Sequence, residues 1–533
     1  MDYASYPYPS RRMPVFAPRG VVATSQPLAA QAGLAMLQKG GTAIDAVIAT
    51  AAALTVLEPT SNGIGSDAFA LIWDGTKLHG LNGSGRSPAA MSMDGLRAAG
   101  YTSMPQRGWW SVTVPGAPKT WADLHARYGK LPFAELFEPA IYYAEHGFAV
   151  SPTIARLWAA GHETFVTCSG PEYTPWFDTF APNGRPPVAG ERWRSAGHAA
   201  TLRTIAASKA ADYYEGKLAQ KIAAFSAETG GLVTRDDLAA HTNTWVDPIG
   251  TSYRGYDVWE IPPNGQGIAA LIGLNILEGT DSASYARESV DSYHLQIEAV
   301  KLGLADARKY VADMEKADVP VKGLLDKAYA AGRRALIGDR AIEPGPGKPP
   351  KGGTVYLCAA DANGMMVSYI QSNFSGFGSG IVIPGTGIAL QNRAYGFATE
   401  VGHRNQVAPN KRPFHTIIPA FLTHQDRAVG PFGVMGGHMQ AQGHLQMMVN
   451  TLDHGMNPQA SIDAPRWQWT EGRAVTVESE VDPAIVRGLQ ERGHEVCVED
   501  NLAYGRAQII WKLPAGGYVA GSEKRTDGLA AGY

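Results

Sequence analysis

The stretch Gly352-Gly353-Thr354-Val-Tyr-Leu-Cys-Ala-Ala-Asp361 places two glycines directly before a threonine that begins an apolar, strand-like run. The glycines leave the peptide bond before Thr354 sterically open. A threonine in this position can attack the preceding carbonyl and become the N-terminus of a new chain. Its α-amino group, with a pKa of roughly 7.7–8.0, then serves as general base for its own hydroxyl. The stretch therefore predicts a self-processing amidohydrolase that is cleaved between Gly353 and Thr354.

The segment before this stretch has the composition of an exposed linker. Residues 343–353 read Glu-Pro-Gly-Pro-Gly-Lys-Pro-Pro-Lys-Gly-Gly, and Pro/Gly-rich segments of this kind are open to cleavage. A phosphate-binding loop is disfavoured, because Gly353 separates the lysine from Thr354 and the prolines remove N–H donors. A threonine that begins a strand is most often only a β-former. The self-cleavage hypothesis therefore depends on the open peptide bond and the linker together.

Helical and strand-like patterns alternate outward from the linker. After it, residues 354–361 and 365–371 flank Asn363-Gly364, which indicates a β-hairpin. Before it, the patterns predict helices at 25–38 with Ser25 as N-cap, at 42–57 with Thr42 as N-cap, in several pieces across 118–240, and at 289–313, with strands at 68–73, 77–81 and 253–260. Later strands are expected at 416–422, 475–477, 507–511 and 518–520. The alternation favours a layered body of helices and strands.

A second glycine-rich turn, Gly433-Val-Met-Gly436-Gly437-His438, precedes a helix expected at 442–452. Backbone N–H groups at the start of a helix can stabilise an oxyanion. An ordinary strand-to-helix turn is the commoner meaning of this pattern, so the turn alone does not identify a site. Residues 62–67, Asn-Gly-Ile-Gly-Ser-Asp, are likewise too weak a signal to indicate a dinucleotide.

Composition disfavours several other classes of protein. The 533 residues are 45% hydrophobic and 18% charged, as in an ordinary folded protein. A net charge of −3 argues against a nucleic-acid partner, and the lack of an apolar run of about 18 residues argues against a membrane span. The N-terminus has no apolar h-region, so we expect no Sec-type signal. Cys168, Cys358 and Cys497 are too scattered for a disulfide framework or a zinc site. We expect a cytoplasmic protein without metal or cofactor.

The motifs together resemble the γ-glutamyltransferase (glutathione hydrolase) family of N-terminal nucleophile (Ntn) hydrolases, from about Val21 to Tyr533. Before the linker, the motifs in family order are Gly40-Gly-Thr-Ala-Ile-Asp-Ala46, Val114-Pro-Gly116, Tyr128-Gly-Lys-Leu-Pro132, Pro139-Ala-Ile141, Tyr253-Arg-Gly-Tyr256 and Pro262-Pro263. After it come Thr354, Asp361-Ala-Asn-Gly364, Phe377-Gly-Ser-Gly380, Gly387-Ile388, Pro409-Asn-Lys-Arg-Pro413, Gly436-Gly437, Asn450 and Asp527-Gly-Leu-Ala-Ala-Gly-Tyr533. So many motifs in one order make the resemblance specific.

The resemblance implies an α+β fold, namely a four-layer αββα sandwich of the Ntn-hydrolase type with an extra helical region in the N-terminal fragment. It implies a zymogen that cleaves itself before Thr354. The large fragment (1–353) and the small fragment (354–533) would stay associated as one intertwined unit, with a dimer of such heterodimers as a further option. Thr354 would be the nucleophile, Ser372 the hydroxyl that positions it, and Gly436 and Gly437 the oxyanion hole. The reaction would be acyl transfer through an acyl-enzyme, resolved by water or an acceptor amine.

The sequence departs from the family where substrate is bound. The family's arginine for the donor α-carboxylate aligns with Ser84, two residues before Arg86, and its acid for the α-amine aligns with Gly396. Beside Asn392, a glutamine of the family is Arg393 here. A pocket that loses an acid and gains an arginine should prefer an acyl group with a carboxylate and no ammonium, since a buried Arg–carboxylate contact contributes on the order of 1.5–3 kcal/mol. The candidate substrate-binding residues are Arg393, Asn392, Arg86, Asn373, His415 and Thr416, the last two in place of a Ser-Ser pair.

The predicted function is hydrolysis of a γ-glutamyl or similar small carboxylate-bearing amide. The sequence is most similar to the branch that contains oxamate amidohydrolases and glutathione hydrolase-like proteins. Oxamate, or a glutaryl group as in cephalosporin acylases, is therefore an alternative acyl group, and hydrolysis should exceed transpeptidation. A relative that folds alike but only binds is the alternative of a different class. The presence of Thr354, Ser372 and Gly436-Gly437 argues against it.

Overall fold

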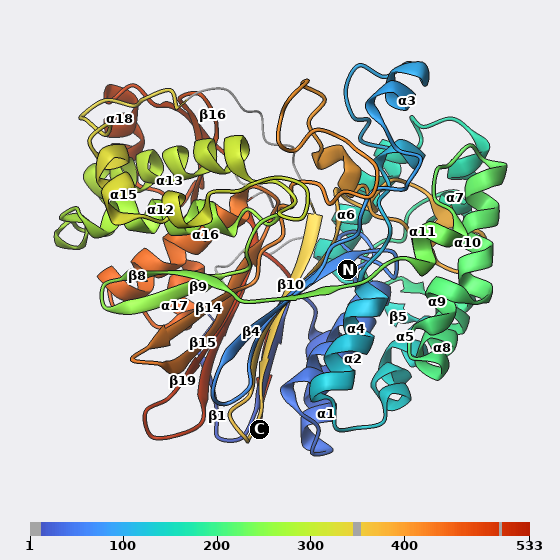
Figure 1. Ribbon diagram of the computed structural model, residues 1–533. Helices are drawn as coiled ribbons and strands as arrows, with labels where there is room; N and C mark the ends of the chain where they lie inside the picture. The colour runs from blue at the N-terminus through green and yellow to red at the C-terminus, as the bar shows by residue number, and fades with distance from the viewer. Residues whose placement is uncertain (1–11, 345–352, 500–503) are drawn as a thin grey trace.

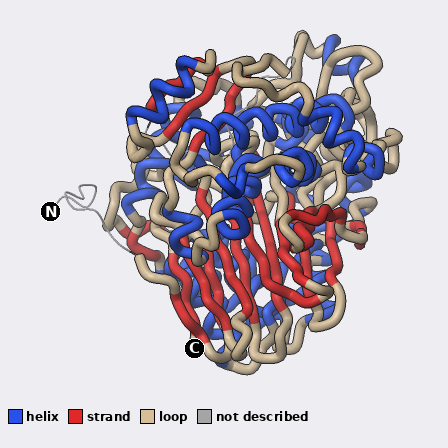
Figure 2. Tube along the Cα trace, turned by 90° about the vertical axis from the view of Figure 1, so that its left-hand side faces the viewer, coloured by secondary structure: helices blue, strands red, loops and turns tan. Residues whose placement is uncertain are grey.

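The centre of the molecule consists of two antiparallel sheets of seven strands each, which lie face to face between two layers of helices (Figure 1). The computed structural model describes residues 12–344, 353–499 and 504–533. Figure 2, turned by 90°, shows the strands of the sheets running side by side, with helices in front of their upper part. The four-layer αββα sandwich expected from the family resemblance is confirmed.

The first sheet contains the strand that begins with the predicted nucleophile. Its order is β21 (Leu529–Gly532), β2 (Val21–Thr24), β10 (Gly353–Ala360), β11 (Met366–Phe374), β3 (Asp67–Trp73), β4 (Leu78–Gly83) and β7 (Thr244–Val246). Side chains alternate along β10. Val355, Leu357 and Ala359 pack with the helices on the outer face, whereas Tyr356 and Cys358 pack against the second sheet.

The second sheet closes over the inner face of the first. Its order is β1 (Val15–Ala17), β20 (Tyr518–Ser522), β19 (Arg506–Lys512), β15 (Arg427–Met435), β14 (Ala420–His424), β9 (Tyr256–Glu260) and β8 (Ile249–Tyr253). β10 passes directly over β15 and β19. The approach is close at Gly433 of β15, where an added Cβ would stand 2.4 Å from the ring of Tyr356. Glycine at this point lets the two sheets meet.

The helical layers differ in character. On the second sheet lie α12 (Gly267–Glu278), α13 (Val290–Tyr310) and α16 (Met439–Met448); on the first lie α1 (Pro27–Gln38), α2 (Ala43–Leu57) and α4 (Ala117–Tyr128). Every residue of α2 is buried, because its alanines allow close packing between β10 and the next helices. Outside it, the extra helical region contains α5 (Glu138–His146), α6 (Pro152–Phe165), α7 (Thr174–Phe180), α8 (Ala196–Ser208), α9 (Ala211–Glu215), α10 (Lys217–Glu228) and α11 (Arg235–Ala239).

Local predictions from the sequence are partly confirmed. Thr42 caps α2 in a capping box with Asp45, as its position predicts. Ser25 was wrongly expected to cap α1: the N-cap is Gln26, and the Ser25 hydroxyl instead donates to Glu58 Oε2 at 2.5 Å. Residues 253–260 are not one strand, because the chain turns between β8 and β9. The strand expected at 416–422 begins only at Ala420. Most of the predicted linker, residues 345–352, lies outside the described residues.

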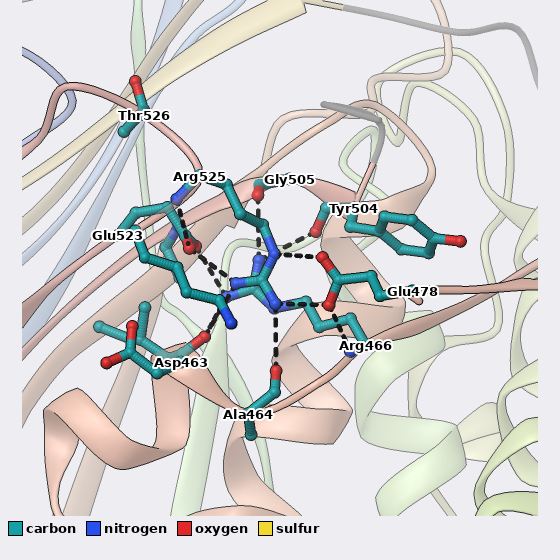
Figure 3. Close-up of polar contacts among 12 residues, drawn as sticks. Asp463, Ala464, Arg466, Glu478, Tyr504, Gly505, Glu523, Arg525 and Thr526 are labelled. Carbon is teal, nitrogen blue, oxygen red and sulfur yellow. Dashed lines mark hydrogen bonds and ion pairs between the residues drawn. The ribbon is translucent and has the colours of Figure 1, made fainter. Parts of the chain in front are cut away.

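A buried cluster of charged residues joins the C-terminal elements (Figure 3). Arg466 donates to Glu523 Oε2 at 2.8 Å, and Arg525 donates to both Glu523 and Glu478. Backbone carbonyls of Tyr504, Gly505, Ile462 and Ala464 accept the remaining contacts. Burial by itself raises the pKa of Glu523, but the two guanidinium groups and a backbone N–H lower it to about 2. Both arginines are thus surrounded by acceptors.

None of the helices in the described ranges is both long and apolar enough to cross a membrane.

Candidate functional site

Three neighbouring strands present Thr354, Ser372 and Asp67 on one face of the first sheet. Ser372 on β11 stands opposite Asp67 on β3, and β11 pairs on its other edge with β10. Side-chain alternation puts Thr354 on the same face as Tyr356, toward the second sheet. All three polar side chains are buried. The strand register therefore collects a small polar group at one end of the space between the sheets.

The hydroxyl groups of Thr354 and Ser372 are in direct contact. Their oxygens lie 3.1 Å apart, and either one can be the donor. The N–H of Phe374 donates to Ser372 Oγ at 2.7 Å, which holds that hydroxyl in place. Phe374 itself has a φ of +75°, in the left-handed region that non-glycine residues rarely adopt. Backbone strain of this kind is typical of sites where a side chain must be held in one position.

Asp67 connects the strand face to His415 and Arg393. Its Oδ1 accepts a hydrogen bond from the N–H of Gly85 at 3.1 Å, while Oδ2 lies 3.1 Å from His415 Nε2 and 3.9 Å from Arg393 Nε. Burial raises the pKa of Asp67 to about 7, against the opposing effect of Arg393 and of nearby N–H groups. Burial, and then the charge of Arg393, lowers the pKa of His415 far below its ordinary value. His415 is therefore a neutral imidazole at physiological pH.

Arg393 is a fully buried cation whose donors are only partly used. Burial lowers its pKa to about 9, against the opposing charge of Asp67, so it remains charged at neutral pH. Its Nη1 donates to Thr416 Oγ1 at 2.9 Å, and its guanidinium lies 4.3 Å from the centre of the Phe374 ring. Among the described residues, Nε and Nη2 have no hydrogen-bond acceptor. Such a group is costly to bury unless something else supplies an acceptor.

Gln266 joins the arginine side of the site to the glycine-rich turn. Its Nε2 donates to the carbonyls of both Thr416, at 2.7 Å, and Gly437, at 2.8 Å. The carbonyls of Gly436 and Gly437 also accept hydrogen bonds from the first turn of α16. The N–H groups of the two glycines precede this turn, where a helix offers them no acceptor. The turn is thus fixed beside Thr416, in a form suited to binding an anion.

A cavity of about 380 Å³ lies beside this group. Phe374 and Thr416, which contact Ser372 and Arg393, form part of its wall, together with His438, Gly396 and Arg308. A volume in this range suits a small-molecule ligand. The wall of the cavity therefore includes residues that directly contact Ser372 and Arg393.

Gly396, which aligns with an acidic residue of the family, has no space for a side chain. An added Cβ would stand 2.7 Å from the carbonyl oxygen of Phe414. An acid here would require the backbone to move. The described residues around the cavity include no aspartate or glutamate.

Arg86, Asn392 and Asn373, the other expected binding residues, form hydrogen bonds with other parts of the chain. Arg86 points to Glu315, with Nη2 2.7 and 2.9 Å from its carboxylate oxygens, and is not part of the described cavity wall. Asn392 shapes the loop, since Oδ1 accepts from the N–H of Ser375 and Nδ2 donates to the carbonyl of Gln106. Asn373 Oδ1 accepts from Ser66 Oγ at 2.8 Å.

Sequence reasoning missed Asp67, Gln266 and Arg308. In the sequence, Asp67 stands at the end of a glycine-rich loop. It also lies two residues before Phe69 and four before Leu71, and so shares with them the inner face of β3. Continuing that alternation by one residue pair would have identified it. Gln266 and Arg308 carry no local signal, because their roles depend on how α12 and α13 pack against the second sheet.

A second buried cluster has the residue types of a metal site. The ligand atoms of His294, Glu298 and His494 lie within 4.8 Å of one another. However, His294 Nδ1 is already 2.8 Å from His494 Nε2, and Lys301 Nζ lies 2.7 Å from Glu298 Oε1. A cation therefore already neutralises the carboxylate, and the cluster is better explained as a buried polar network than as a metal site.

Comparison with known proteins agrees with the geometry. The model of the gamma-glutamyltranspeptidase family matches residues 29–533. The crystal structure of a cephalosporin acylase from Bacillus halodurans superimposes with a TM-score of 0.97 at 55% identity, covering 100% of this chain and 99% of that one.

Two curated relatives match over similar lengths. The glutathione hydrolase-like YwrD proenzyme of Bacillus subtilis is 36% identical over 97% of this chain and 99% of its own length. The oxamate amidohydrolase proenzyme of Klebsiella pneumoniae is 34% identical over 96% and 98%. Because the family model matches almost the whole chain, this chain belongs to the γ-glutamyltranspeptidase family of Ntn hydrolases, enzymes that act on amide bonds.

Proposed function

We propose that this protein is a self-processing threonine amidohydrolase, with Thr354 as the nucleophile of both self-cleavage and substrate hydrolysis. The observation that carries the proposal is the 3.1 Å contact between the hydroxyls of Thr354 and Ser372, on adjacent strands at the end of the space between the sheets. Glycines 436 and 437 directly precede His438 in the chain, and His438 forms part of the cavity wall. A nucleophile, a positioning hydroxyl and a turn suited to an oxyanion are the parts that acyl transfer requires.

Self-cleavage would proceed by an N-to-O acyl shift. Thr354 Oγ attacks the carbonyl carbon of Gly353, the C–N bond breaks, and the nitrogen takes up the proton to become the α-amine of Thr354. Water then hydrolyses the resulting ester and releases the carboxylate of Gly353. The large and small fragments, 1–353 and 354–533, are the products.

Substrate hydrolysis would repeat the same chemistry with the new amine as general base. The amine accepts the proton of Thr354 Oγ as this oxygen attacks the substrate carbonyl, and it returns the proton to the leaving amine. The N–H groups of Gly436 and Gly437 would stabilise the negative oxygen of the intermediate. Water, deprotonated by the same amine, then releases the acid and regenerates the enzyme.

The acyl group we propose carries a carboxylate and no ammonium. Arg393 supplies a buried cation with unused donors, and the residue that could bind an ammonium is replaced by Gly396. The relatives include an oxamate amidohydrolase and a cephalosporin acylase. Oxamyl and glutaryl groups are therefore the two acyl groups that we propose beside a γ-glutamyl group. Thr416 accepts a hydrogen bond from Arg393, and His415 contacts Asp67, so these two residues hold the charged groups in place.

The two fragments should remain associated after cleavage. The first sheet alternates between them, because β10 and β11 of the small fragment lie between β2 and β3 of the large fragment. Separating the fragments would break both edges of this strand pair. A dimer of such heterodimers and a cytoplasmic location complete the proposal. The oligomeric state is tested by measuring the mass of the native particle.

The proposal is tested by a denaturing gel and an amide panel. The purified chain should separate into fragments of about two thirds and one third of 56.8 kDa, whereas Thr354→Ala should remain whole and inactive. The processed protein should hydrolyse oxamyl or glutaryl amides at a higher kcat/KM than γ-glutamyl-p-nitroanilide. A single uncut band that Thr354→Ala does not change would favour the non-catalytic alternative. Equal kcat/KM on the three donors would contradict the acyl preference.

A further inference from the structure

The cavity wall contains a second arginine that neither the motifs nor the nucleophile account for. Arg308 lies in the last turn of α13, and of the described residues around the cavity it is the one that carries a charge at neutral pH. Its guanidinium lies 4.8 Å from the centre of the Trp469 ring, a stacking contact that holds the planar group in one orientation. Burial lowers its pKa to about 10, with Glu471 opposing, so it stays cationic.

His438 lies within electrostatic reach of both arginines. Burial, and then the charges of Arg308 and Arg393, lower its pKa to about 3, which keeps the imidazole neutral. Its side chain is 6% exposed and forms part of the cavity wall, and its Nδ1 has no hydrogen-bond partner among the described residues. A buried polar nitrogen beside a cation, in a wall whose described residues include no acid, is suited to a ligand that brings negative charge and hydrogen-bonding oxygens.

The cavity is large enough for Arg308 and Arg393 to bind different parts of one substrate. At roughly 30 Å³ per water, its volume of about 380 Å³ corresponds to about a dozen waters, more than a two-carbon oxamyl group would fill. Arg393 is not among the described residues of the cavity wall, but it contacts two of them, Thr416 and Phe374. It lies on the side of the reacting hydroxyls, whereas Arg308 belongs to α13, in the helical layer over the second sheet.

We infer that Arg308 and His438 form an anion subsite for a substrate carboxylate that is several bonds away from the scissile carbonyl. The inference rests on the proposed function to the extent that the cavity receives the amide substrate. Arg308 would take the carboxylate oxygens in a bidentate contact, and the imidazole would supply a further hydrogen bond. The carboxylate can belong to either side of the amide: to the acyl chain or to the leaving amine.

Matched substrates separate these two sources. Glutaryl-p-nitroanilide carries the carboxylate on the acyl chain, the pentanoyl amide of p-aminobenzoate carries it on the leaving amine, and pentanoyl-p-nitroanilide has none. For Arg308→Gln we expect kcat/KM to fall tenfold or more on one of the charged substrates, chiefly through KM. The loss on the neutral substrate should be several-fold smaller. The charged substrate whose kcat/KM falls identifies which side of the amide carries the bound carboxylate. Arg308→Lys should recover part of the lost kcat/KM on that substrate.

The control is Lys309→Gln, which removes one charge from the same turn of α13 at an exposed side chain over Tyr310. It should behave as the wild type on all three substrates. Equal losses for Arg308→Gln on charged and neutral substrates, or no loss on any, would overturn the inference.

Calorimetric titration of the processed protein with glutarate provides a readout that does not require turnover. The wild type should bind glutarate at least tenfold more tightly than Arg308→Gln, and equal affinities would overturn the inference. If the wild type hydrolyses none of the amides but shows this difference in glutarate affinity, the proposed function fails while the subsite stands. If it hydrolyses the amides and the variant is unaffected in both assays, only the subsite fails.

Discussion

Two buried groups of arginines in this protein differ in how far they are neutralised. At the C-terminal end, Arg466 and Arg525 share Glu523 and Glu478, and backbone carbonyls accept their remaining contacts (Figure 3). Near Ser372, Arg393 has one nearby acid among the described residues, Asp67, whose own pKa is raised to about 7. In the first group, protein acceptors surround the guanidinium groups. In the second group, we expect a bound anion to supply the acceptors that Arg393 lacks. Incomplete pairing of the guanidinium with acceptors, more than burial itself, therefore distinguishes a ligand-binding arginine from a structural one.

The largest effect is expected from breaking the complete group. Arg525→Met removes the guanidinium that joins Glu478 to Glu523, which leaves Glu478 without its ion-pair partner and Glu523 with Arg466 alone. Removing one member of a buried ion pair costs about 3–5 kcal/mol. Chemical denaturation should show a fall of that order in the free energy of unfolding.

Arg473→Met is the matched control. Arg473 lies between β16 (Trp467–Glu471) and β17 (Ala474–Val477), close to Glu478 in the chain, but it is exposed in its pairs with Glu343 and Glu495. Its unfolding free energy should change by less than about 1 kcal/mol. Similar losses in the two variants would show that pairing in the complete group is not what stabilises this end of the molecule.

The reverse pattern is expected for the incomplete group. Arg393→Met should lower kcat/KM on a carboxylate-bearing amide by about ten- to a hundredfold, the equivalent of roughly 1.5–3 kcal/mol for a charged hydrogen bond. The free energy of unfolding should change by no more than about 1 kcal/mol, because Asp67 keeps its contacts with Gly85 and His415. Steady-state kinetics and denaturation of one preparation provide both values. Loss of stability without selective loss of activity would place Arg393 with the structural arginines.

The smallest effect concerns pH. The pKa of Asp67 is raised, so the folded protein binds this proton more tightly than the unfolded chain, and the contribution of the group to stability falls as the pH rises from about 4 to about 7. Below pH 7 the neutral Asp67 leaves the charge of Arg393 available, whereas above it the carboxylate competes with the ligand. The inhibition constant of glutarate should rise several-fold between pH 6 and pH 8.5.

Asp67→Asn distinguishes this titration from the others at the site. The new α-amine of Thr354 also loses its charge in this range, with a pKa of roughly 7.7–8.0. Arg393, with a pKa of about 9, keeps most of its charge, Arg412, whose charge also acts on Asp67, stays cationic, and His415 stays neutral. The variant should retain only the part of the pH dependence that belongs to the amine. An unchanged profile would mean that Asp67 does not titrate here.

The sequence was sufficient for features that depend on neighbouring residues. Asn363-Gly364 predicted the β10–β11 hairpin, and the position of Thr42 predicted the N-cap of α2. Features that depend on distant segments were not predictable in this way. Arg86 appeared close to the missing family arginine, but it is bound to Glu315, more than two hundred residues away. Asp67 and Arg308 become part of the site only through strand register and helix packing.

The most direct test is the identity of the residue that carries the acyl group. Intact-mass analysis of the processed protein should show a small fragment that begins at Thr354 and contains residues 354–533. Rapid quenching during turnover of a glutaryl or oxamyl amide should add the mass of one acyl group to this fragment, at Thr354. A small fragment that begins elsewhere, or an acyl group carried by another residue, would contradict the assignment of Thr354 as the nucleophile.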